Sequence, residues 1–279
     1  MIMKKRVVSL FSMAFMMIIV VGCSSGLTLE EVITKSQEHF DNAESMDVRI
    51  AIALNMETSD GDAFDMAIEM DMAIFTDPLK SRTMMTTDIG GFPLNTELYM
   101  ISDDNTFSTY THMQGMWMKQ EMDRALFEAA MQGNDISVYL EVISDLAENF
   151  ELEATTRNGS PSYRVAGVVS GEAMASIMET VQGLDELGIS LDALPDWSEL
   201  DGFSMTIYID QDSLAIELIT IDLTDMMASL MGIMMAEMGV DEKLKIHTYT
   251  IEIEYLSFNS STPFQLPEAA RDAVVLPSW

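Results

Sequence analysis

The single cysteine of the chain, Cys23, is the residue whose position points most directly to chemistry. It follows an apolar run over residues 7–21, which begins directly after three basic residues at positions 4–6. A basic start, an apolar core and a small residue at the break mark a secretory signal peptide, and the run is too short and wrongly flanked for a spanning helix. We therefore expect residues 1–22 to be removed, which leaves the Cys23 thiol at the new N-terminus and available for acylation.

The sequence Val20-Val21-Gly22-Cys23 resembles the lipobox of bacterial lipoproteins. The resemblance implies that Cys23 becomes a lipidated first residue carrying palmitate-type chains, and that the protein is anchored on the extracytoplasmic face of the cell membrane. Two other interpretations are an ordinary signal sequence that contains a cysteine, and an uncleaved anchor. Because residues 23–26 form a very short tether, we expect the folded part to lie close to the bilayer.

Other side chains that could do chemistry are scattered. The histidines have no HExxH pattern and no close Asp/His spacing, and no glycine-rich phosphate loop is present. These histidines are His39, His112 and His247. The acidic turn formed by Asp60, Asp62 and Asp65 does not fit the EF-hand pattern and is read as a solvated turn. We expect no catalytic residues and no cofactor, and therefore a binding protein and not an enzyme.

Methionine is unusually abundant, with 27 residues in the chain. Thioether sulfur is a soft ligand, which raises the possibility of copper. Most of these methionines, however, occupy the inward positions of alternating strands or amphipathic helices, where they pack into a core. We therefore expect no metal site.

The chain is strongly acidic, with 14 Lys and Arg against 46 Asp and Glu and a formal net charge of −32. Such a surface is repelled by phosphates, which excludes nucleic acid as a partner. With no second cysteine there is no disulfide framework, so stability must come from a hydrophobic core. The length allows one large domain or two small ones; we expect one domain over residues 27–279, and a monomer.

Two segments carry the clearest local signals. Thr28 and Glu31 form a capping box that predicts a helix over residues 28–43. After it, apolar residues occupy the even positions from Val48 to Met56 and from Phe64 to Ile74, on either side of a turn at residues 59–61. This period of two predicts a long antiparallel hairpin whose even-numbered side chains all lie on a covered face.

The remaining elements follow from weaker patterns. Strands are predicted over residues 80–88, 94–101, 106–111, 115–119, 203–209, 214–223 and 243–258, with two more strands around the Asn158-Gly159 turn. Two helices are predicted within residues 121–150 and one over 171–183, while 184–201 is read as a loop and 264–277 as a closing helical turn and tail.

Residues 226–238 are apolar almost all round and too short to span a bilayer. They form either a buried core helix or an element that covers an apolar opening or dips into a membrane. In the second interpretation, the lid residues are Met227, Leu230, Met231 and Met234.

Long antiparallel strands with one apolar face must either close around the few helices or leave a cavity, so we predict an α+β fold with a large curved sheet wrapped over helices. A methionine-rich face suits flexible apolar ligands such as acyl chains. The predicted cavity lining comprises Ile50, Ile52, Leu54, Met66, Ile68, Met70, Leu98, Met205, Ile207, Ile251 and Ile253.

The order of these elements, from the lipobox to the Pro267-Glu268-Ala269-Ala270 turn, resembles the LolA/LppX-like lipoproteins, including Gram-positive members of unknown function. The resemblance covers residues 27–277. It implies an unclosed half-barrel with a hydrophobic cavity for lipid or acyl chains. The chain departs from the soluble LolA carrier because it keeps its own anchor and because Arg49 lies on the polar side of its strand, so the carrier's buried arginine is not carried over.

Two functions therefore stand side by side. In the first, the protein is a membrane-anchored lipoprotein that binds lipid or another hydrophobic ligand in a cavity between sheet and helices. The alternative is a structural or interaction lipoprotein whose core is filled by its own helices and which binds a protein partner. An elongated apolar cavity would distinguish the first from the second.

Overall fold

The computed structural model describes residues 26–103, 106–124, 149–180, 196–237 and 244–276. Its strands are β1 (Ser45–Glu57), β2 (Ala63–Thr76), β3 (Leu79–Ile89), β4 (Phe92–Ser102), β5 (Thr106–Met113), β6 (Met116–Asp123), β7 (Phe150–Arg157), β8 (Ser160–Val169), β9 (Phe203–Asp210), β10 (Ile216–Asp222), β11 (Lys245–Phe258) and β12 (Val274–Val275). The helices are α2 (Leu29–Asp41), α5 (Gly171–Thr180) and α6 (Thr224–Glu237), with short 3-10 turns η3 (Trp197–Glu199) and η4 (Glu268–Asp272).

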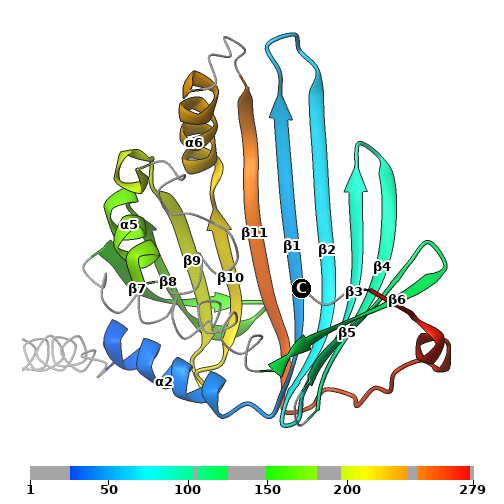
Figure 1. The fold of residues 1–279 in the computed structure, drawn as a ribbon. Coiled ribbons are helices and arrows are strands. Elements are labelled where there is room, and N and C mark those ends of the chain that lie inside the picture. Colours follow the sequence, from blue (N-terminus) through cyan, green and yellow to red (C-terminus); the bar gives the residue numbers. More distant parts are fainter. Residues whose placement is uncertain (1–25, 104–105, 125–148, 181–195, 238–243, 277–279) are drawn as a thin grey trace, which may run out of the picture.

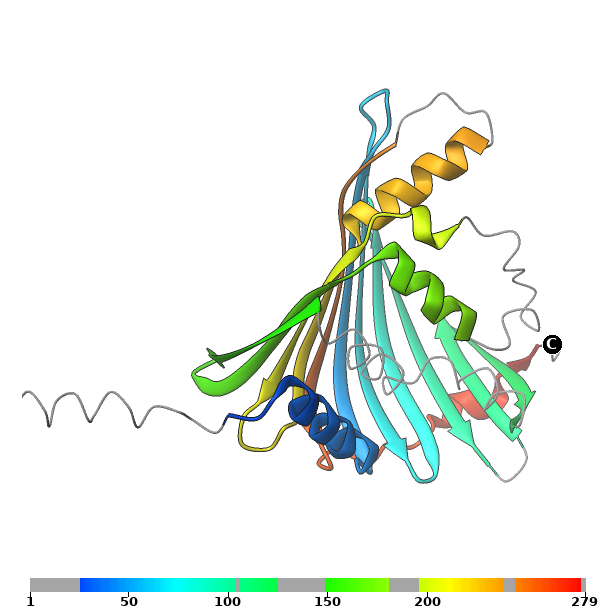
Figure 2. The same ribbon diagram turned by 90° about the vertical axis from the view of Figure 1, so that its left-hand side faces the viewer.

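All twelve strands form one open sheet in the order β12-β6-β5-β4-β3-β2-β1-β11-β10-β9-β8-β7 (Figure 1). Neighbouring strands are antiparallel except β12, which runs parallel to β6. Figure 2 shows α5 and α6 on the same side of the curved sheet. The structure is therefore mostly sheet, and the predicted α+β class describes it only roughly.

Helix α2 begins as the capping box predicts. The Thr28 hydroxyl accepts a hydrogen bond from the backbone N–H of Glu31 at 3.2 Å, and the Glu31 carboxylate accepts one from the Thr28 N–H at 2.8 Å. The hydrogen bond from the Thr28 backbone lowers the pKa of the exposed Glu31 carboxyl. Two donors that a helix start leaves without partners are thus satisfied by one pair of residues.

The β1–β2 hairpin has the predicted register. Val48 lies opposite Met72 and Ile52 opposite Ile68, so the even-numbered side chains share one face. Strand β11 continues this face, because Ile251 lies opposite Ile52. The prediction that the whole face is covered is wrong near the turn: Val48 is 4 % exposed, whereas Phe64 is 38 % exposed.

The predicted pair of helices within residues 121–150 is wrong at both ends. Strand β6 continues to Asp123 and β7 begins at Phe150, while residues 125–148 lie outside the described part of the chain. The period of two persists beyond the predicted strand, because Met118, Gln120 and Met122 alternate with Lys119 and Glu121. Helix α5 begins at the predicted residue and is described to Thr180, and η3 lies within the segment read as a loop, of which residues 181–195 are not described.

One half of the sheet carries the main core. Helices α2 and α6 pack over β8, β9 and β10, and the side chains at the centre are almost completely buried. They include Val32 and Ile33 of α2, Val165 of β8 and Ile207 and Ile209 of β9, none more than 1 % exposed. Burying one such side chain stabilises the fold by roughly 1.5–3 kcal/mol, so this cluster is the centre of stability.

The C-terminal segment crosses the outer face of the other half. Phe264 packs edge-on against Phe75, with ring centroids 5.8 Å apart, and against Tyr99 at 5.6 Å. Tyr99 is therefore only 3 % exposed although it points away from the helices. Burial, reinforced by a hydrogen bond from its hydroxyl to Glu97, raises the pKa of Tyr99 to about 12. The predicted closing turn corresponds to η4; β12 was not predicted.

Candidate functional site

The concave face of the sheet carries no Asp, Glu, Lys or Arg within the paired residues of β1 to β6. The inward positions of β2 alternate with acidic outward ones: Met66, Ile68 and Met70 face inward, whereas Glu69 and Asp71 face outward. In a chain with 46 acidic residues this separation is a strong pattern. The concave face of β2 to β6, called the open face below, is formed by apolar residues interspersed with neutral hydroxyls and one amide.

The outward side shows where the charges lie. The Arg49 guanidinium donates to Asp71 at 2.9 Å and lies 3.8 Å from Glu254. Arg49 is thus on the polar side of β1, as its parity predicts, and has no access to the concave face.

The two halves of the sheet differ in how far their inward side chains are buried. Beneath the helices, Met205 and Ile207 are 4 % and 1 % exposed. On the open face and in neighbouring β1, the predicted lining residues are only half-buried; these are Ile50, Ile52, Leu54, Met66, Ile68, Met70 and Leu98. Ile251 and Ile253 lie between the two halves, and Ile253 packs against the main core. The predicted set therefore spans a packed region and an accessible one.

Exposure increases toward the rim formed by the β1–β2, β3–β4 and β5–β6 turns. Phe64, Phe92, Leu94, Met113 and Met116 face inward near these turns and are 38 %, 77 %, 43 %, 39 % and 61 % exposed. The rim thus continues the apolar character of the open face into solvent.

The predicted cavity lining omits several open-face residues, which are Met72, Met85, Leu94, Met100, Met118 and Met122; of these, Met72 was predicted on the inward side of its strand. In β3 the run Met84-Met85-Thr86-Thr87 has no alternation, so only its pairing with β2 decides that Met85 and Thr87 face inward. Two signals were available: the alternation in β2, which includes Met72, and the alternation of methionine and charge in β6.

Helix α6 uses one side for the core. Met226 is 7 % exposed, and Met227, Leu230 and Ile233 pack against the main core cluster. Met231 is half-buried and Met234 is 42 % exposed. Figure 1 shows α6 beyond the upper ends of β9 and β10 and beside the upper part of β11. A role as lid stays a prediction for its exposed side.

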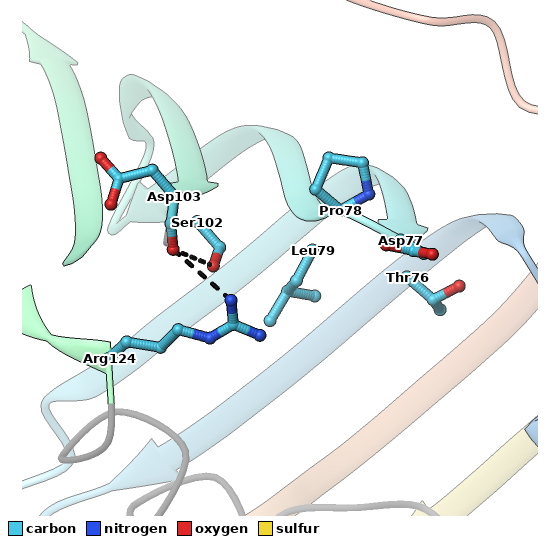
Figure 3. Close-up of a pocket in the computed structure, with 7 residues that line it drawn as sticks. All are labelled: Thr76, Asp77, Pro78, Leu79, Ser102, Asp103 and Arg124. Carbon is cyan, nitrogen blue, oxygen red and sulfur yellow. Dashed lines mark hydrogen bonds between the residues drawn. The ribbon is translucent and has the colours of Figure 1, made fainter. Parts of the chain in front are cut away.

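A cavity of about 600 Å³ lies at the end of the open face opposite the rim (Figure 3). It is lined by Thr76, Asp77, Pro78, Leu79, Ser102, Asp103 and Arg124. The Arg124 guanidinium donates to the Asp103 carbonyl at 3.5 Å, and the Ser102 hydroxyl donates to the same oxygen at 3.4 Å. Thr76, Leu79 and Ser102 have the inward parity of their strands, so the cavity is continuous with the open face.

Three smaller hollows lined by described residues have volumes of about 540, 440 and 300 Å³. They lie beside the β1–β2 turn and α6, at the end of α2, and across β1 and β2 near their turn. None of these hollows runs along the open face.

Among the described residues, shifted pKa values belong mainly to carboxyl groups at helix caps and turns. The Ser198 hydroxyl lowers the pKa of Asp196, and the backbone N–H of Ser213 lowers the pKa of Asp210. Both carboxylates accept hydrogen bonds that close a local turn, which is a structural role. The described part of the chain brings together no group of three His, Cys, Asp or Glu suited to a metal ion. A search of the same residues finds no helix with the length and hydrophobicity needed to cross a membrane.

This geometry defines a class of protein that is built on one open antiparallel sheet. The concave face of the sheet is uncharged, and helices cover half of it. The chain belongs to the family DUF6612, a family of unknown function, whose model matches residues 28–275. The comparison with curated proteins finds no match.

Several solved structures are similar to this chain. LprF from Mycobacterium bovis is 11 % identical with a TM-score of 0.41, and the match covers 86 % of this chain and 96 % of LprF. A DUF1329 family protein from Desulfovibrio piger is 7 % identical, with coverage of 85 % and 93 % and a TM-score of 0.24. A LolA superfamily protein from Nitrosomonas europaea is 7 % identical, with coverage of 87 % and 96 % and a TM-score of 0.19. These structures include a LolA superfamily protein, which belongs to the group that the sequence resembles.

Proposed function

We propose that the protein is a membrane-anchored, extracytoplasmic lipoprotein that binds a lipid or another hydrophobic ligand on the open face. The observation that supports this most directly is the half-exposed, uncharged surface of β2 to β6 in a chain of net charge −32. Apolar surface left in water is unfavourable by about 25 cal/mol for each Å², so an extended apolar face implies something that covers it.

The dimensions and side chains of the open face suit an acyl chain. From Ser81 to Ile89, strand β3 rises about 27 Å at ~3.4 Å per residue. Two opposed leaflets of acyl chains fill about 30 Å of a bilayer, so one chain fits along this strand. Methionine is unbranched and polarizable, which lets Met70, Met72 and Met85 adapt to chains of different shape.

The lipid anchor belongs to the same proposal. Cys23 and the signal sequence lie outside the described residues, and α2 is capped at Thr28, a few residues after the proposed acylation site. We expect Cys23→Ser to release the protein from membranes or to leave it unprocessed, measured by detergent-phase partitioning and N-terminal mass. Unchanged partitioning with normal cleavage would count against the lipobox.

A protein-binding lipoprotein with a self-filled core is the second candidate. The complete burial of Ile207 and Ile209 beneath α2 and α6 favours it for that half of the sheet. Native mass spectrometry of the protein, extracted gently from its own membrane, separates the two functions. A co-purifying lipid mass supports the ligand binder, whereas a protein partner without lipid supports the alternative.

A matched pair of lysine substitutions on β2 tests the open face. Met70→Lys places an ammonium group on the concave side, and Ala67→Lys places the same group on the outer side of the same strand. An ammonium group that a bound acyl chain covers without giving it a partner is strongly unfavourable, so Met70→Lys should weaken uptake of a neutral fluorescent acyl probe at least tenfold. Ala67→Lys should leave uptake unchanged. Equal uptake by both variants would contradict binding on this face.

A further inference from the structure

Two hydroxyl groups on β3 are buried without any hydrogen-bond partner. Ser81 and Thr83 are 3 % and 4 % exposed, and neither side-chain oxygen has a partner. Buried hydroxyls are nearly always satisfied, because an unpaired one destabilises the folded state. The described residues contain two more such hydroxyls, Ser36 and Ser261, but Ser81 and Thr83 lie two residues apart on the inward side of one strand, where a single ligand could contact both.

Both hydroxyls belong to the open face. Thr83 lies opposite Met72 on β2 and Leu98 on β4. Ser81 lies between Ile74 and Met100 in the same way. The two groups are thus a polar spot within an apolar surface, and each has one flexible methionine beside it, Met100 or Met72, that can move to admit a ligand.

The cavity of about 600 Å³ adjoins this spot, since Leu79 lines it and precedes Ser81 on the same side of β3 (Figure 3). Its lining holds two carboxylates, Asp77 and Asp103, against one guanidinium, Arg124. This balance disfavours an anionic head group. The Asp103 carboxylate already accepts a hydrogen bond from the Thr106 N–H at 2.8 Å and points away from Arg124 (Figure 3). Carboxylates accept hydrogen bonds, so Asp77 suits a neutral head that carries hydroxyl donors.

We propose that Ser81 and Thr83 donate hydrogen bonds to the ester group of a neutral acylglycerol-type lipid, whose hydroxylated head occupies the adjoining cavity. The acyl chain then lies along the open face toward the rim, past Met85 and Leu94. This inference rests on the proposed function and adds to it the class of ligand and its direction.

The experiment compares three probes that differ in one group each. They are 1-palmitoylglycerol, the matched hexadecyl glycerol ether, which lacks the ester carbonyl, and palmitate, which replaces the neutral head by a carboxylate. Each competes with a neutral fluorescent acyl probe for the purified full-length protein. The wild type should bind the ester about tenfold more tightly than the ether, the difference expected for hydrogen bonds made in an apolar site, and more tightly than palmitate.

Three variants identify the groups responsible. The double variant Ser81→Ala/Thr83→Val should lose the preference for ester over ether, with an unchanged or higher melting temperature because it removes unsatisfied hydroxyls. Thr83→Ser keeps a hydroxyl and should keep the preference. Thr87→Val removes a hydroxyl from the same side of β3 nearer the rim and should also keep it.

The outcomes separate this inference from the proposed function. Equal binding of ester and ether by the wild type overturns the hydroxyl subsite while ligand binding stands, and tighter binding of palmitate overturns the neutral head. A much lower melting temperature of the double variant, with the preference intact, shows that the hydroxyls are structural. Failure of all three probes to bind contradicts the proposed function itself.

Discussion

The two halves of the sheet are built from the same kind of strand and differ in what covers them. In β8 to β10, inward residues such as Val165 and Ile207 are completely buried by helices. In β2 to β6, inward residues such as Met70 and Leu98 are half-exposed, and Phe92 at the rim is 77 % exposed. The difference shows that apolar alternation determines which face points inward, whereas helix docking determines whether that face becomes core.

The side chains differ as well. The covered half is centred on β-branched apolar residues with one preferred rotamer, such as Val165, Ile207 and Ile209, whereas methionine is the most frequent apolar residue of the open face. Stiff side chains favour a single packed arrangement, and flexible ones favour a surface that adapts. Substitutions grouped into four experiments test or sharpen this comparison, from the largest expected effect to the smallest.

Ile207→Ala should destabilise the protein by about 2–5 kcal/mol, because it opens a cavity in a packed region. Met70→Ala on the open face should destabilise it by less than about 1 kcal/mol, since the side chain is only half-buried. Denaturant unfolding of both variants measures the contrast. Equal losses would mean that the open half is packed as tightly as the covered half.

Helix α6 lies between core and solvent, and its two sides can be tested separately. Leu230→Ser should lower stability by about 2–4 kcal/mol because Leu230 packs on the main core. Met234→Ser should change stability by no more than about 0.5 kcal/mol because Met234 is 42 % exposed. If α6 is a lid, Met234→Ser weakens probe uptake; unchanged uptake assigns the helix to the core alone.

The capping box of α2 contributes a smaller amount to the covered half. Thr28→Ala should cost about 1 kcal/mol, because the Glu31 N–H loses its acceptor. The hydrogen bonds at this cap lower the pKa of Glu31, so their contribution is present above the unfolded pKa and is lost as the pH falls through the lower folded value. Thr28→Ala keeps the bond from its backbone N–H to the Glu31 carboxylate, so the charge dependence is tested with Glu31→Gln. Thermal unfolding of wild type and Glu31→Gln from pH 7 to acid should converge, and a constant gap between these two would contradict a charge-dependent cap.

Tyr99, on the outer side of the open half, should make the stability of the protein depend on pH in the alkaline range. Its pKa is raised from 10.0 to about 12, so its stabilising contribution is fully present below pH 10 and is lost as the pH rises toward 12. At neutral pH, Tyr99→Phe should change stability by about 1 kcal/mol or less. Between these two pH values the variant should lose less stability than the wild type, measured by denaturant titration. Parallel losses would show that Tyr99 does not titrate with unfolding.

Local patterns in the sequence predicted much of this fold. The strict alternation from Val48 to Ile74 determined the β1–β2 register, and Thr28 with Glu31 determined the start of α2. The register of β3 could not be predicted, because Met84 and Met85 are equally apolar and only pairing with β2 distinguishes them. The burial of Tyr99 depends on Phe264, which lies far along the chain, and no local pattern reports such a contact.

The sequence predicted which face of the sheet carries the candidate site, but not which part of that face stays accessible. Parity assigned Ile68 and Met70 to the inward side, but it could not show that Met205 and Ile207 would be covered while Met70 stayed accessible. Ser81 and Thr83 were invisible for the same reason, since an isolated Ser or Thr in a strand has no periodic signal. Only their burial without partners marks them.

The two-residue strand β12 has a consequence for assembly. A sheet that stays open has two edges, and each edge is a template onto which the strand of another molecule can add. Val274 and Val275 pair with Met118 and Lys119, and the Leu276 N–H donates to the Lys119 carbonyl at 2.8 Å, so β12 occupies the middle of the β6 edge. Growth of a continuous sheet from copy to copy needs both edges, so a segment of a few residues obstructs the addition of a full-length strand along β6.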